Sequence, residues 1–168
     1  MMRNGWRYGL GLLGLMLTSA VVQADVPITV SAVIVAPACQ VSGVNGETKL
    51  EVPFGDVLVQ HAGTAKAEKS VGIRVKCTAG APVGKSLKMY LTPTSHGVMR
   101  SMGQNVLGTS MSGVGIALTG NQTPLNIGQW VPMNAGVLTL TGRLVIQDGI
   151  SLEGGEFSAD MSLFASYM

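Results

Sequence analysis

His61 and His96 are the only imidazoles in this sequence that could act as a general base. Nucleophilic catalysis needs a base beside the nucleophile and a third group that orients the base. Both histidines lie in polar, glycine-bearing sequence without a G-x-S-x-G elbow nearby. Nine Asp and Glu residues are present, but no pair of them stands out from an ordinary charged surface. The sequence therefore predicts no catalytic site, and we expect a protein that is not an enzyme.

Two glycine-rich stretches look like nucleotide-binding loops. Residues 9–14 (GLGLLG) match G-x-G-x-x-G, but they lie in an apolar run that follows no strand. Residues 80–86 (GAPVGKS) have three residues between the glycines where a phosphate loop has four, and no helix follows them. Two distant histidines would not hold a catalytic metal. We therefore expect no cofactor, no metal and no small-molecule substrate.

The first 24 residues have the organisation of a secretory signal peptide. Arg3 and Arg7 give a basic start, residues 10–17 an apolar run, and residues 22–24 (VQA) a small-residue cleavage site. The run is shorter than the roughly 20 apolar residues of a membrane-spanning helix. Cleavage would leave 144 residues, the size of one domain, with nine Lys and Arg against nine Asp and Glu. Because no basic cluster remains, we expect no binding to nucleic acid.

Cys39 and Cys77 are the only cysteines, and both follow the predicted cleavage site. In the oxidising compartments outside the cytoplasm, a lone pair of cysteines is expected to form a disulfide. Closing this loop would stabilise the fold by roughly 4 kcal/mol in the chain-entropy model. A metal site is the weaker alternative, because neither cysteine belongs to a C-x-x-C pair.

Short runs of Val, Ile and Thr bounded by Gly, Pro and Asn predict an all-β sandwich or barrel. No convincing amphipathic helix is present. We expect strands over residues 26–35, 39–44, 49–59, 70–78, 86–92, 113–119, 137–147 and 156–167.

The first and last of these strands alternate most clearly between apolar and polar positions. Near the start, Pro27, Thr29 and Ser31 form a polar face until Val33 and Val35 break the contrast. The opposite face of this first strand carries Val26, Ile28, Val30, Ala32 and Ile34. In the last strand, one face is polar except for Phe164, and the other carries Phe157, Ala159, Met161, Leu163, Ala165 and Tyr167. Period-2 alternation of this kind predicts half-buried strands at both ends of the exported chain.

In this order and spacing, the motifs make the chain similar to a subunit of chaperone-usher pili, most closely the minor pilins of type 1 and P-type fimbriae. The resemblance extends over essentially all of the sequence after the signal peptide. It rests on the alternating arm and on residues 37–39 (PAC), 52–57 (VPFGDV), Cys77, 113–118 (GVGIAL), 155–159 (GEFSA) and Tyr167.

The resemblance implies an incomplete immunoglobulin-like sandwich, the pilin fold, that lacks its last strand. Residues 1–24 would be the signal peptide, residues 25–36 a donor-strand arm, and residues 37–168 a single pilin domain. The acceptor groove would lie beside the C-terminal strand, lined by its apolar face. The arm would fill the groove of another subunit through Val26, Ile28, Val30, Ala32 and Ile34, the mode of strand addition known as donor-strand complementation.

The partners implied by the resemblance are a periplasmic pilus chaperone, an outer-membrane usher and neighbouring pilin subunits. The chain would be exported through the periplasm to a fimbrium on the cell surface and would support adhesion. We favour a minor subunit, an adaptor or tip-fibrillum component, with a major rod pilin as the alternative. A secreted carbohydrate-binding sandwich module is the alternative from a different class. Alternation alone also leaves open that the arm is an ordinary first strand of its own sandwich.

Overall fold

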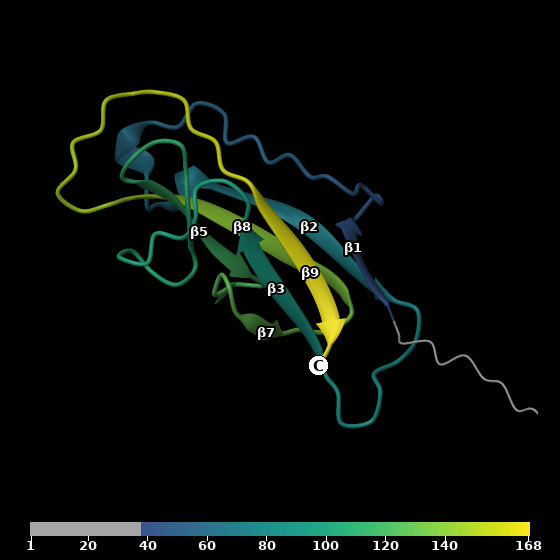
Figure 1. The fold of residues 1–168 in the computed structure, drawn as a ribbon. Helices are drawn as coiled ribbons and strands as arrows, with labels where there is room; N and C mark the ends of the chain where they lie inside the picture. The colour runs from purple at the N-terminus through teal and green to yellow at the C-terminus, as the bar shows by residue number, and fades with distance from the viewer. Residues whose placement is uncertain (1–37) are drawn as a thin grey trace, which may run out of the picture. The chain divides into compact units, whose positions relative to one another are not determined.

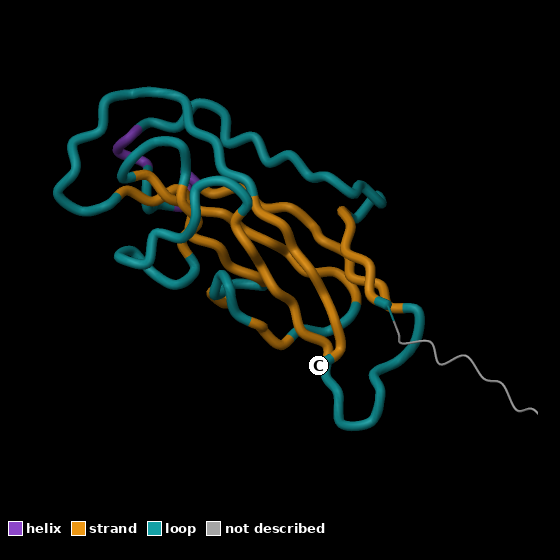
Figure 2. The backbone as a smooth tube through the Cα atoms, viewed as in Figure 1, coloured by secondary structure: helices purple, strands orange, loops and turns teal. Residues whose placement is uncertain are grey.

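The computed structural model describes residues 38–168 (Figure 1). The predicted signal peptide and the predicted donor-strand arm lie outside the described residues. This includes the five arm residues that are expected to enter the groove of another subunit. Strands and loops make up nearly all of the described part (Figure 2). Its elements are β1 (Cys39–Gly43), two 3-10 turns η1 (Val59–His61) and η2 (Ala65–Ala67), β2 (Glu68–Cys77), β3 (Leu87–Pro93), β4 (Val106–Gly108), β5 (Val114–Gly120), β6 (Thr123–Pro124), β7 (Trp130–Pro132), β8 (Gly136–Ile146) and β9 (Met161–Tyr167).

These strands form two antiparallel sheets. The large sheet has the order β1-β2-β8-β5-β4, with β6 paired to β5, and the small sheet has the order β7-β3-β9. The predicted all-β sandwich is confirmed. Several neighbours in the sheets are distant in sequence, as in the pairing of β2 with β8 and of β3 with β9, so long-range contacts fix the order of these strands.

The core lies between the two sheets and follows the period-2 pattern of the central strands. In β8, Leu138, Leu140 and Leu144 are buried, while the intervening Thr139 is exposed. Met89 and Leu91 of β3 close the core from the small sheet. Burial of such alternating apolar faces is the main source of stability for a half-buried strand.

Most of the expected strands are found in the structure. The strands over 39–44, 70–78, 86–92, 113–119 and 137–147 are confirmed to within two residues at each end. The last strand begins at Met161 rather than at residue 156. The short strands β4, β6 and β7 were not expected, because each has only two or three residues and therefore too little pattern to recognise.

The strand expected over residues 49–59 is wrong: residues 49–58 have no strand pairing. Pro53 offers no backbone N–H, and Gly55 has a positive φ of 68°, which an extended strand does not adopt. The apolar side chains of this segment still pack against the core. Phe54 lies over Gly142 of β8, where an added Cβ would be 3.5 Å from the ring. The segment therefore contributes side chains to the core without joining a sheet.

The described residues contain no helix that is long and apolar enough to span a membrane.

Replacing Leu91 by Ala is expected to lower the free energy of unfolding by about 2–5 kcal/mol, because Leu91 is 0% exposed and its removal leaves a cavity. Urea denaturation of the purified protein measures this effect. Val83→Ala is the matched control, since Val83 is fully exposed in the loop between β2 and β3 and should change the free energy by at most about 0.5 kcal/mol. Equal effects of the two substitutions would contradict this assignment of the core.

Candidate strand-docking site

β9 forms one edge of the small sheet. It pairs with β3 along its whole length, from Leu87 opposite Tyr167 to Pro93 opposite Met161. On its other side, no described strand pairs with it. β1 is likewise an edge strand of the large sheet, and Cα atoms of β1 and β9 come within 8 Å of each other (Figure 1). No backbone hydrogen bond joins the two strands within residues 38–168.

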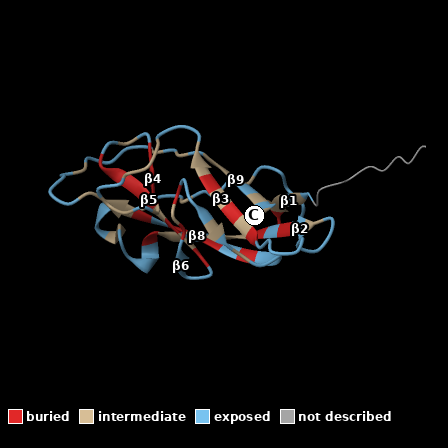
Figure 3. Cartoon of the chain, turned by 60° about the horizontal axis from the view of Figure 1, so that its bottom comes forward, coloured by how far each residue is buried: buried red, intermediate tan, exposed pale blue. Residues whose placement is uncertain are grey.

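Burial falls sharply from β3 to β9, although the two strands face the same core (Figure 3). Leu91 is 0% exposed, whereas Leu163, directly opposite in the register, is only partly buried. The same contrast holds between Met89 and Ala165. Every residue of β9 is partly buried or exposed. Within residues 38–168, the core-facing side of β9 is therefore only partly covered.

In the large sheet, too, core-facing side chains become less buried toward the edge strand, β1. Val75 of β2 is 2% exposed, while Val41 of β1, its direct register partner, is only partly buried. The described structure thus leaves an apolar strip of the core incompletely covered between two unpaired edges. Val41 belongs to this site but was not among the expected groove residues. The alternation of Cys39 and Val41 directly after the arm was the available signal.

The residues expected to line the acceptor groove lie along this edge. Phe157, Ala159, Met161 and Leu163 pack against the core cluster while remaining partly buried. Ala165 and Tyr167 continue the same face of β9 and are also partly buried. The expected groove residues therefore share one face, although their role in docking stays a prediction.

Phe157 and Ala159 precede β9 and are positioned by different contacts. The backbone here is held by two serines, because Ser110 Oγ accepts from Ser158 N at 3.0 Å and Ser95 Oγ accepts from Asp160 N at 3.2 Å. The ring of Phe157 packs edge-on against Phe54 at a centroid distance of 5.7 Å. The alternation of the sequence continues through this segment, but in place of a regular strand ladder the backbone is held by these two serine bonds and by backbone bonds from Ser110 N to the Ser158 carbonyl and from Thr94 N to the Asp160 carbonyl.

Two contacts hold the end of the site at which β1 begins and β9 ends. The predicted disulfide between Cys39 and Cys77 is confirmed, and it links β1 to β2 at a directly opposed register pair. At the other end of β1, the Asn45 amide donates to the Glu47 carboxylate at 2.9 Å and lowers the pKa of that carboxyl. Tyr167 Oη donates to the Ala79 carbonyl oxygen at 3.2 Å, which ties the end of β9 to the loop after β2.

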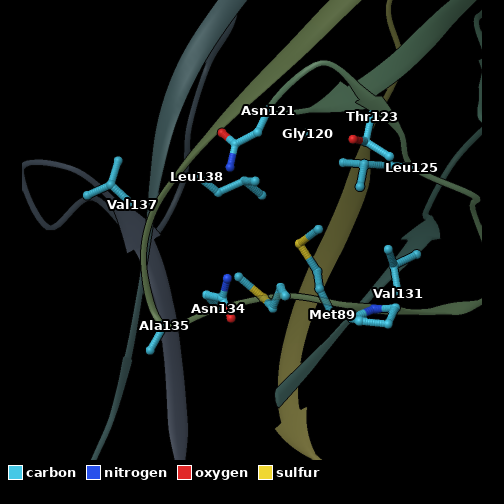
Figure 4. A pocket seen from close by; sticks show the side chains of 12 residues that line it. Met89, Gly120, Asn121, Thr123, Leu125, Val131, Asn134, Ala135, Val137 and Leu138 are labelled. Carbon is cyan, nitrogen blue, oxygen red and sulfur yellow. The ribbon is translucent and has the colours of Figure 1, made fainter. Parts of the chain in front are cut away.

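A separate cavity of about 370 Å³ opens near the β5–β6 turn and the loop before β8 (Figure 4). Its wall contains Met89, Leu125 and Leu138 together with the amide side chains of Asn121 and Asn134. None of the residues lining it is an acid, a base or a thiol, and none belongs to β1 or β9. The cavity therefore offers no acid–base chemistry of its own and is distinct from the strand-docking site.

Comparisons with known proteins agree with this geometry. The sequence model of the family described as Fimbrial protein matches residues 28–167. The Escherichia coli minor fimbrial protein PrsF is 32% identical over 119 residues, which cover 69% of this chain and 66% of that protein. The E. coli fimbrial adapter PapF is 28% identical over 92% of this chain and 95% of its own length.

Solved structures show the same fold. The P pilus adaptor subunit PapF superimposes with a TM-score of 0.54 at 26% identity, covering 80% of this chain and 98% of that chain. The P pilus rod subunit PapA superimposes with a TM-score of 0.56 at 18% identity, covering 78% of this chain and 99% of that chain, a likeness of fold alone. The chain belongs to the fimbrial protein family and is a structural subunit of a pilus. The resemblance seen in the sequence and the expected pilin fold are thereby confirmed.

Reducing the disulfide is expected to lower the free energy of unfolding by roughly 4 kcal/mol, because the unfolded chain regains the freedom of the closed loop. Urea denaturation with and without dithiothreitol measures the difference. The double variant Cys39→Ser with Cys77→Ser is the control and should show the lower stability under both conditions. Equal midpoints for the unmodified protein in both conditions would contradict a stabilising role.

Proposed function

We propose that the chain is an adaptor subunit of a chaperone-usher pilus, which joins two neighbouring subunits by strand exchange. It accepts a strand from one neighbour beside β9 and donates residues 25–36 to the other. The adaptor position is supported by the relatives, a minor fimbrial protein and a fimbrial adapter. The observation that carries the acceptor role is the contrast between fully buried Leu91 on β3 and partly buried Leu163 opposite it.

An added strand would complete both the hydrogen bonding and the core. Every second residue of an edge strand points its N–H and C=O away from its paired neighbour, so β9 offers a backbone template along its length. Each backbone hydrogen bond contributes about 0.5–1.5 kcal/mol net. Each apolar side chain that becomes fully buried contributes about 1.5–3 kcal/mol. A strand that inserts several such side chains would form a long-lived joint.

Residues 25–36 have the composition that such a joint requires. Val26, Ile28 and Val30 stand on one face, and Ala32 supplies a small residue among the larger ones. Pro27 donates no backbone hydrogen bond, which is acceptable near the start of an added strand. Two residues separate the end of the arm from the disulfide-bonded Cys39, and the disulfide fixes the first described strand of the sandwich. This placement supports donation to another molecule.

The open edge also accounts for the need for assembly partners. An apolar edge strand without a neighbour promotes aggregation through strand pairing. A periplasmic chaperone that covers β9 would remove this hazard, and an outer-membrane usher would be the place where a neighbouring subunit replaces it. On this proposal the chain passes through the periplasm to a surface fimbrium, which supports cell adhesion.

Leu163→Asp is expected to weaken the complex with the chaperone by at least about 100-fold, because a carboxylate would enter an apolar site without a partner. Co-purification from the periplasm measures the complex. Ser166→Asp is the matched control, since Ser166 lies on the exposed, opposite face of the same strand and its substitution should leave the complex intact. Equal recovery of chaperone with the two variants would contradict the acceptor site.

Deleting residues 26–34 tests the donor role separately. The truncated chain should still bind the chaperone, because the acceptor site lies within residues 38–168. It should not be attached to the subunit that normally receives the arm. Immunoblotting of purified pili measures incorporation, and truncated chains found in pili at the normal level would contradict the donor role.

A further inference from the structure

A row of three aromatic side chains crosses the outer face of the small sheet. Leu87, Met89 and Leu91 of β3 face the core, so Tyr90 stands on the opposite side of the sheet. In the register, Tyr90 lies directly between Trp130 of β7 and Phe164 of β9. The rings of Tyr90 and Trp130 have centroids 5.1 Å apart, with an angle of 47° between their planes. The row ends at Phe164, on the unpaired edge.

Phe164 is an unusual residue for this place. It is 53% exposed, and the outward positions on either side of it are Ser162 and Ser166. The sequence has three phenylalanines, and the other two, Phe54 and Phe157, are partly buried and pack against each other. An exposed aromatic on an unpaired edge strand favours unwanted association. A docked strand would give Phe164 a neighbour and remove that cost.

A strand added beside β9 would present two faces. Its inward side chains would meet the core, and its outward side chains would continue the row that passes from Trp130 through Tyr90 to Phe164. Directly opposed residues on one face of a sheet have Cβ atoms about 4.5–5.5 Å apart, and aromatic side chains also reach the diagonal neighbours. The outward residue nearest to Phe164 would therefore contact its ring.

We propose that Phe164 is a specificity-determining residue that selects a docked strand by its outward face. The occupant is the N-terminal arm of a neighbouring subunit that carries a β-branched or aromatic residue beside Phe164. The arm of this chain has that character itself, because Val33 and Val35 interrupt its polar face. Aromatic and β-branched residues form favourable cross-strand pairs, whereas serine does not cover the ring. This inference rests on the proposed function, since it requires a strand beside β9.

Competition between two synthetic peptides for the chaperone-bound, full-length chain tests the proposal. One peptide has the sequence of residues 25–36, and the other carries Thr29→Ser, Val33→Ser and Val35→Ser with all inward residues unchanged. The unmodified chain is expected to prefer the first peptide by about two- to five-fold, the size of one or two cross-strand pairs. Phe164→Ser is expected to bring the ratio of the two affinities close to one.

Trp130→Ser is the matched control. Trp130 is an exposed aromatic of the same row at 40% exposure, but β3 separates its strand from β9, so the preference should persist. Phe164→Val keeps a β-branched apolar side chain and should retain part of the preference. If Phe164→Ser weakens both peptides equally and leaves the ratio unchanged, Phe164 only supports β9 and the inference is wrong. If neither peptide binds the unmodified chain, the site does not accept a strand of this composition and the inference is wrong, whereas the acceptor function is tested separately by Leu163→Asp.

Discussion

The backbone of an edge strand has hydrogen-bonding groups that the strand's own sheet does not satisfy, and in this protein that strand also carries part of the core. β9 is paired with β3 on one side only, and its core-facing residues are half-buried. Water can satisfy the free N–H and C=O groups, but it cannot cover apolar side chains favourably. An extended strand with alternating apolar residues would both pair with the free backbone groups and cover the apolar side chains. The architecture of the described residues is consistent with a site built to receive one.

The remaining structure holds the two edges of this site in place. The core-facing side chains of β3, Leu87, Met89 and Leu91, are buried, and β3 pairs with β9 along its whole length. On the opposite edge, the disulfide of Cys39 and Cys77 fixes β1 to β2. Ordering a site before its partner arrives reduces the conformational entropy lost on binding. The disulfide therefore holds β1, one edge of the candidate site, against β2.

The sequence predicted those features that local pattern determines. Alternation from Met161 to Tyr167 indicated both a strand and its inward face, and two cysteines in an exported chain indicated the disulfide. The pattern gave a wrong prediction for residues 49–59. Phe54 packs against the core there, but the backbone around it, which includes Pro53 and Gly55, joins no sheet. The alternation of Cys39 and Val41 indicated which face of β1 points inward, but the partial burial of Val41 depends on what lies across from β1 in the fold, which local pattern does not show. Phe164 stood out as an exception, but only the register with Tyr90 relates it to a row across the sheet.

Amide hydrogen exchange followed by mass spectrometry tests the central claim most directly. The exchange of the chain alone would be compared with that of the proposed complex with a periplasmic chaperone. We expect slower exchange in the complex at the two edges that flank the site, β9 (Met161–Tyr167) and β1 (Cys39–Gly43). Exchange at β7 (Trp130–Pro132), the far edge of the small sheet, should not change. Protection confined to β7, with β9 exchanging as fast as before, would contradict the account.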